Sequence, residues 1–155
     1  MIGRPKRSRL LMLVVAFALV TTPVALGLRA TTLKLSSKMT AARVVPKKPR
    51  GNVAHASGTF VGTLTSSGSR WKLSWRVTYS RLAHPSIVIA DVHYGKPGHF
   101  GPFVVRLCGP CKSGQHGVRK VKASWIPAIK LGNTFMTLIT GKNPNGEIRG
   151  QIKVG

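Results

Sequence analysis

A ten-residue alternation is the feature that most constrains what this chain can fold into. In WKLSWRVTYS (71–80), large apolar residues occupy every second position, and Lys, Ser, Arg and Thr occupy the positions between them. Successive side chains of a β-strand point to opposite faces, so the pattern predicts a strand with an aromatic face in the core. Its cationic face should meet water, as in an antiparallel sheet that is solvated on one side.

Six further segments carry strand signals and are separated by short turns. They are SGTFVGTLT (57–65), SIVIADVHY (86–94), PFVVRLC (102–108), GVRKVKASW (117–125), NTFMTLIT (133–140) and GEIRGQIKV (146–154). The last two flank Asn-Pro-Asn-Gly, a strong turn signal. No segment shows a helical period of useful length. About seven antiparallel strands at regular spacing predict a β-sandwich or Greek-key barrel over residues 56–155.

The chain before this domain divides into two predicted parts. Residues 1–28 have a basic start, an apolar middle and small residues at the end, which is typical of a secretory leader helix. The uncharged run 10–28 is also long enough to span a bilayer, so a cleaved signal peptide and a retained membrane anchor both stay open. Either form predicts export. Residues 29–55 carry seven cations and no acid, which predicts a basic flexible linker.

The charge balance narrows the classes of function. The chain has 25 Lys and Arg against 2 Asp and Glu, a net charge of +23. A disordered polycation is excluded because 43% of the residues are hydrophobic and three Trp need burial. The only carboxylate side chains, Asp91 and Glu147, leave little for acid–base catalysis. We therefore expect a noncatalytic module without a cofactor. Its partner would be an anionic cell-envelope polymer, a lipid surface or an unidentified extracellular protein.

Nucleic acid is expected to bind only nonspecifically, because the cations and the aromatic residues of 71–80 lie on opposite faces.

The alternative function is that of an exported redox enzyme that depends on a metal or on a thiol. Cys108-Gly-Pro-Cys111 could be a local disulfide, a redox pair or half of a zinc site, and export favours the disulfide. Asp91 and His93 share one strand face and, with His99 nearby, are candidate metal ligands.

Three motifs between Ser57 and Ile152 resemble the CHRD domain, the module repeated in chordin and found singly in many bacterial exported proteins. The strongest is the ending TGKNPNGEIRGQI (140–152); ADVH with GPFVV, and GTFVGTL near the start, are weaker. The matching positions are Ala90, His93, Gly95, Gly101, Pro102, Thr140, Gly146, Glu147, Ile148, Arg149, Gly150 and Gln151. Asp91 departs from the pattern, which often has His there. The resemblance implies an extracellular immunoglobulin-like or Greek-key β fold and no particular activity.

The closing motif also predicts an ion pair. Glu147 and Arg149 have the same parity along one strand, so both should project from one face while Ile148 and Ile152 face the core. A carboxylate among so many cations is expected to pair with the nearest one. We therefore expect Glu147 and Arg149 to form an ion pair that stabilises the fold.

Overall fold

The computed structural model describes residues 30–83 and 88–155, and its nine strands, which hold about half of these residues, form one antiparallel sheet. Its strands are β1 (Thr32–Thr40), β2 (Ser57–Ser67), β3 (Arg70–Ser80), β4 (Val88–Tyr94), β5 (Phe103–Cys108), β6 (His116–Val121), β7 (Thr134–Thr140), β8 (Ile148–Gln151) and β9 (Lys153–Val154). The predicted leader, 1–28, lies outside the described residues. Within residues 30–83 and 88–155, no helix has the length and apolar character needed to cross a bilayer.

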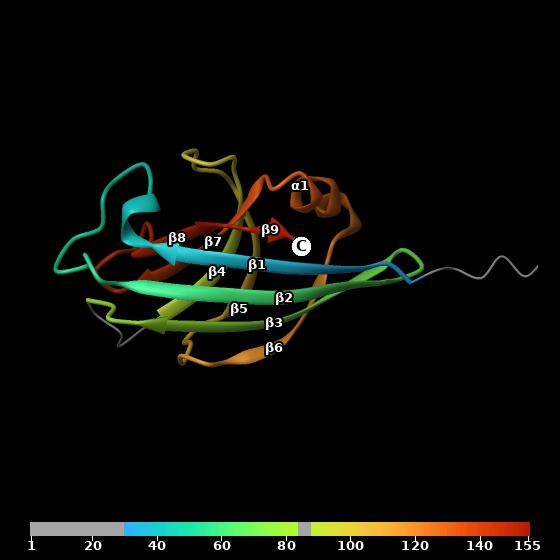
Figure 1. Cartoon of the computed structure of the whole chain (residues 1–155), viewed down its shortest axis with the longest axis horizontal. Helices are drawn as coiled ribbons and strands as arrows, with labels where there is room; N and C mark the ends of the chain where they lie inside the picture. The colour runs from blue at the N-terminus through green and yellow to red at the C-terminus, as the bar shows by residue number, and fades with distance from the viewer. Residues whose placement is uncertain (1–29, 84–87) are drawn as a thin grey trace, which may run out of the picture.

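The sheet curls until its two edges nearly meet. The strand order is β5-β4-β7-β8-β1-β2-β3-β6, and β9 pairs separately with β1. Figure 1 shows the wall of β1, β2, β3 and β6 lying across the wall that contains β4, β5, β7 and β8. At the seam, Arg119 of β6 donates its Nε–H to the Arg106 carbonyl of β5, at 3.1 Å. The predicted all-β antiparallel fold is confirmed, in the form of a nearly closed barrel.

The alternation in β3 has the predicted effect. Leu73, Trp75 and Val77 are at most 4% exposed, whereas Lys72 and Arg76 point to solvent. Their inner neighbours on β2 include Phe60 and Leu64, both fully buried. Burying each side chain of this size contributes roughly 1.5–3 kcal/mol. The core of the barrel therefore forms where period-two patterns from neighbouring strands face one another.

The prediction of a flexible linker over residues 29–55 is wrong for its first half. Residues 32–40 form β1, which pairs with β2 along its whole length and with β8 at its end. Leu35 and Met39 point into the core, and Lys34 and Lys38 point to water. Because the cations occupy only the solvated face, their mutual repulsion is screened and does not oppose the strand. The remainder, from η1 (Ala41–Arg43) onwards, folds over the end of the barrel.

The segment predicted as a strand over 117–125 ends early. β6 stops at Val121, and the chain continues as the 3-10 turn η2 (Ala123–Trp125) and the short helix α1 (Ile126–Lys130). Pro127 fits the first turn of a helix, where its missing N–H costs nothing. Ile126 and Ile129 are buried in the core. The predicted strand 146–154 is likewise divided between β8 and β9.

Candidate functional site

Two rows of side chains from the sequence motifs lie on the outer face of β4, β7 and β8. Asp91 is in register with Thr137, which is in register with Arg149; His93 is in register with Phe135, which is in register with Gln151. We call these six residues the covered face. Their strand neighbours Val92, Met136 and Ile152 point the opposite way, into the core.

The covered face is shielded from water by two segments. One is the chain around Val44, which is 2% exposed. Val44 lies next to Gly146, which in turn lies against Thr137 of the covered face. The other is the loop 95–102 that joins β4 to β5. Asp91, Phe135, Thr137 and Arg149 are all at most 5% exposed as a result. The sheet thus has a second, partly polar core outside the barrel.

Glu147 does not pair with Arg149, so the predicted ion pair is wrong. Its Oε2 accepts hydrogen bonds from Thr140 Oγ1 at 2.7 Å and Asn143 Nδ2 at 3.0 Å, and its Oε1 accepts one from the Ala83 N–H. Glu147 is fully buried and precedes β8, so the two-residue period of the strand does not apply to it. Among the described residues, the one salt bridge joins Arg106 and Asp91.

Arg149 instead holds the loop 95–102 against the sheet. Its Nη2 donates to the carbonyls of His99 at 2.6 Å and Lys96 at 3.3 Å, and its guanidinium lies 3.5 Å from the centre of the Phe135 ring. Burial lowers the pKa of Arg149, but a guanidinium remains a cation in proteins. Gln151 assists by donating to the Gly95 carbonyl at 2.6 Å.

Asp91 and His93, two of the candidate metal ligands, form contacts with other side chains and with the backbone. Both carboxylate oxygens of Asp91 accept from Arg106, at 3.0 and 3.1 Å. His93 Nδ1 lies 3.2 Å from the Gly101 carbonyl, and its ring stacks on Phe135 with centroids 5.3 Å apart. His99 is exposed in the loop above. Across residues 30–83 and 88–155, His, Cys, Asp and Glu do not form a cluster of three that could hold a metal.

Burial dominates the environment of His93. It lowers the pKa of the imidazole; the Gly101 carbonyl and the Asp91 charge act in the opposite direction, and Arg149 adds to the lowering. His93 is therefore neutral at pH 7. A carbonyl can only accept a hydrogen bond, so the proton of the neutral ring lies on Nδ1 and Nε2 carries a lone pair.

The predicted local disulfide is confirmed, since Cys108 and Cys111 are bonded and their Cα atoms lie 5.3 Å apart. Both residues are buried, at 5% and 6% exposed, and no helix of the described chain begins at either. A thioredoxin-type pair needs an accessible thiol at a helix N-terminus. The surroundings here are those of a structural crosslink between β5 and the following turn.

We expect the barrel to fold without this crosslink. Closing such a short loop contributes about 2 kcal/mol in the chain-entropy account, which grows only with the logarithm of loop length. The double variant Cys108→Ala/Cys111→Ala should therefore give a cooperative urea transition at a lower midpoint, with an unchanged slope. Loss of the transition in this variant, or in the reduced protein, would contradict a minor role.

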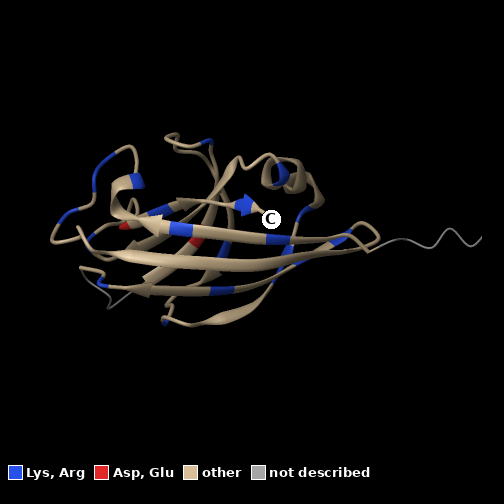
Figure 2. Ribbon diagram, in the orientation of Figure 1, with Lys and Arg blue, Asp and Glu red and all other residues tan. Residues whose placement is uncertain are grey.

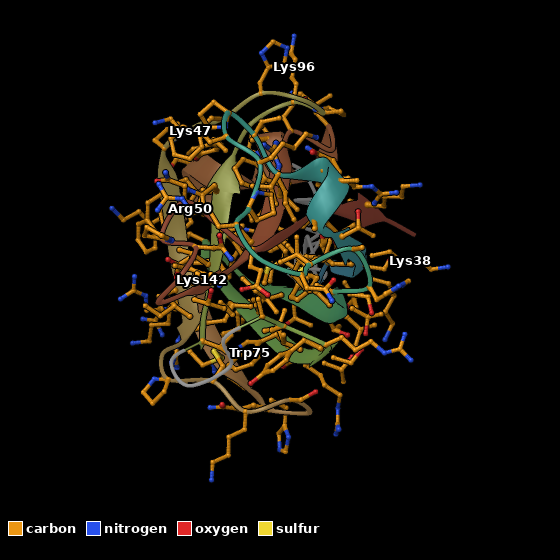
Figure 3. The ribbon with its side chains drawn as sticks, turned by 90° about the vertical axis from the view of Figure 1, so that its left-hand side faces the viewer. Lys38, Lys47, Arg50, Trp75, Lys96 and Lys142 are labelled. Atoms are coloured by element: carbon orange, nitrogen blue, oxygen red, sulfur yellow. A yellow bond between two sulfur atoms is a disulfide. The ribbon has the colours of Figure 1, made fainter. Side chains whose placement is uncertain are left out.

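A basic pocket of about 150 Å³ lies at the end of the barrel where β1 stops. Its cations are Lys47, Lys48, Arg50 and Lys142. Asn143 holds the backbone of Arg50 in place: its Oδ1 accepts from the Arg50 N–H at 2.6 Å, and its Nδ2 donates to the Arg50 carbonyl at 3.2 Å. Figure 3 looks onto this end and shows Lys47, Arg50 and Lys142 along one side of it.

The electrostatic field of this surface is uniformly positive. Lys and Arg are spread over strands and loops, and both carboxylate side chains of the sequence are buried, Asp91 at 2% and Glu147 at 0% exposed (Figure 2). The outer wall of β1 and β3 adds Lys34, Lys38, Lys72 and Arg76, all exposed. No side-chain carboxylate therefore lies on the surface, where it would weaken the attraction between the cations and a bound anion.

The sequence motifs contain Asp91, His93, Arg149 and Gln151 of the covered face, but they do not reveal the basic pocket. In the sequence Asn143 is only part of a turn signal, whereas in the structure it is 4% exposed and has specific hydrogen-bond partners. Lys47, Lys48 and Arg50 belong to the predicted linker. The signal that could have connected them is weak, because Asn143 and Arg50 are 93 residues apart in the chain.

Comparison with known proteins agrees with the motifs. The family model described as CHRD domain matches residues 35–152. The match therefore includes most of β1 as well as the closing hairpin. No curated protein sequence matches the chain, and no solved structure matches it.

Proposed function

This chain belongs to the CHRD domain family, and from that premise we propose that it is an exported, noncatalytic module that binds an anionic polymer of the cell envelope through the basic pocket. The observation that carries the proposal is the convergence of Lys47, Lys48, Arg50 and Lys142 on one concave site. In a flexible linker these charges would be scattered, whereas the Asn143 hydrogen bonds hold the backbone at Arg50 against the turn that carries Lys142.

The pocket suits a phosphate or carboxylate group of a polymer. Lys and Arg side chains donate several hydrogen bonds to such groups, and a concave site with one sign of charge concentrates the field. The exposed wall cations Lys34, Lys38, Lys72 and Arg76 would add long-range attraction to any polyanion. Because attraction at a distance is screened over about 8 Å at physiological salt, direct contacts in the pocket should supply the binding that persists there.

The contacts around the alternative sites support a noncatalytic role. The disulfide is buried, and Asp91 is engaged by Arg106 through both carboxylate oxygens. The acid with the most buried position, Glu147, contacts three donors of the protein itself. The residues that a metal- or thiol-dependent enzyme would use therefore have structural partners.

Removing the pocket cations should abolish most of the binding. The variant Lys47→Gln/Lys48→Gln/Arg50→Gln/Lys142→Gln loses four charges, each worth about 1 kcal/mol near an anionic surface, so retention on the producer's envelope fraction should fall about 1,000-fold. All four side chains are exposed, so the fold should persist. Retention is measured by co-sedimentation of the purified protein at physiological salt and at about 0.5 M salt.

The matched control removes the same number of cations from the wall, as Lys34→Gln/Lys38→Gln/Lys72→Gln/Arg76→Gln. This variant should keep most of its retention at physiological salt, because it leaves the pocket intact. Equal loss in the two variants would show attraction by net charge alone and would refute the pocket. Anionic phospholipid vesicles and duplex DNA, run as separate probes, should bind more weakly than the envelope fraction; stronger binding to either would refute a polymer as the partner.

A further inference from the structure

A second, smaller cleft adjoins the basic pocket. It has a volume of about 70 Å³ and lies over the covered face, between the chain at Val44 and the loop residue Phe100. It shares Pro144 and Asn145 with the basic pocket. An anionic polymer lying in the basic pocket would therefore have a path into this cleft.

Two of the residues that line this cleft have a side-chain nitrogen without a partner. Arg149 Nη1 and His93 Nε2 are both buried, and neither has a hydrogen-bond partner among the described residues. Arg149 itself is 3% exposed. Buried polar atoms of native proteins are nearly always paired, so two unpaired atoms from residues that line one cleft point to a bound group. The Nη1 of the cation donates, and the Nε2 lone pair of the neutral imidazole accepts.

The complement of this pair is an anionic acceptor next to a hydroxyl donor. A carboxylate would accept from Nη1 with its charge balanced by Arg149, and a neighbouring hydroxyl would donate to Nε2. A phosphate dianion fits less well, because Arg149 is the only cation that lines the cleft and Val44, Phe135 and Ile139 make most of its wall apolar. The volume admits the edge of a ligand rather than a whole ring.

Phe100 provides a surface for the remainder of the ligand. It lines the cleft and is 59% exposed, and its ring centroid lies 6.1 Å from that of His93. Exposed aromatic rings of this kind pack against the apolar C–H face of a sugar ring. We propose that the cleft is a subsite for an acidic sugar of the uronic acid class, with its carboxylate on Arg149, a hydroxyl on His93 and its ring on Phe100.

This inference deepens the proposed function and rests on it for the claim that the natural ligand is a polymer. The subsite can be tested with a monosaccharide, which does not need the basic pocket. Titrating the isotope-labelled protein with D-glucuronate should shift the side-chain nitrogen resonances of Arg149 and His93, with a dissociation constant on the order of 1 mM. D-glucose, which lacks the carboxylate, should leave the Arg149 resonance unchanged.

Phe100→Ala and Phe103→Ala form a matched pair. Phe103 is 53% exposed and its centroid lies 5.9 Å from that of His93, but it does not line the cleft. Phe100→Ala should weaken glucuronate binding about tenfold, whereas Phe103→Ala should not change it. Both side chains are exposed, so both variants should fold.

The two proposals fail in different ways. The basic-pocket variant should bind glucuronate like the unaltered protein even though it no longer sediments with the envelope. Absent shifts with glucuronate, equal shifts with glucose, or equal effects of the two Phe variants would overturn the subsite and leave the envelope proposal standing. Glucuronate binding without any envelope retention would overturn the polymeric ligand.

Discussion

Replacing Gly150 by alanine will destabilise the barrel severely, by about 3 kcal/mol or more, because the new methyl group would have to occupy space taken by β1. A Cβ at this position would overlap the Lys38 carbonyl oxygen and Ser37 Oγ, and it would lie 2.7 Å from the Lys38 carbonyl carbon. Two of these three atoms belong to backbone, which cannot rotate away. β8 must therefore separate from β1, which is a central pair of the sheet.

The measurement is urea unfolding followed by tryptophan fluorescence. Gly141→Ala, in the turn of the same hairpin, is the matched control, since nothing lies within 4 Å of its added Cβ. Gly141→Ala should change the free energy of unfolding by less than about 0.5 kcal/mol, as expected for a surface substitution. A Gly150→Ala protein as stable as this control would show that the close approach of β8 and β1 is not required.

Replacing Glu147 by alanine should have a comparable effect, a loss of about 4 kcal/mol in the free energy of unfolding. The carboxylate accepts three hydrogen bonds, and each buried donor left without an acceptor costs roughly 1–3 kcal/mol. Since domains are stable by only about 5–15 kcal/mol, the variant should be marginal at room temperature. Thermal unfolding followed by circular dichroism provides the comparison.

Glu147→Gln separates the charge from the hydrogen bonds. Its amide can accept from Thr140 and Asn143 with one oxygen, but its NH₂ group would face the Ala83 N–H, so one donor loses its acceptor. We expect a loss of about a third of that seen with alanine. Lys153→Ala, at an exposed site, should have almost no effect. If Glu147→Ala were as stable as Lys153→Ala, the buried carboxylate would not hold the hairpin.

The sequence was sufficient for the barrel wherever apolar residues alternate with cations or hydroxyls. β3 is the clearest example, because large side chains such as Trp75 mark its buried positions. β1 alternates as well, but two of its residues with inward parity are Ser37 and the partly exposed Leu33. Because this two-residue alternation is weak and the segment carries several cations, the sequence predicts a linker there. Pairing with β2 and β8, which no local pattern reveals, decides its structure.

The covered face was predictable in part of its membership but not in its contacts. The motif includes His93 and Arg149 of this face and the neighbouring Glu147. Strand parity predicts an ion pair between Glu147 and Arg149, because the parity argument assumes that the strand begins before Glu147. The turn ends one residue later, and neutral donors from residues 83, 140 and 143 reach the carboxylate first. Thr140 and Asn143 belong to the same motif, but the Ala83 donor is 64 residues away in the chain and cannot be deduced from the spacing of one motif.

The direction of β1 has a consequence for any form of the protein that keeps its predicted leader as an anchor. β1 starts at Thr32 and ends at Thr40, beside the basic pocket. Residues 29–31 would give a tether of at most about 10 Å, whereas β1 itself is roughly 30 Å long. In the anchored protein the basic pocket would thus lie at the end of β1 that faces away from the membrane. It would be beyond the lipid headgroups and accessible to polymers outside the cell.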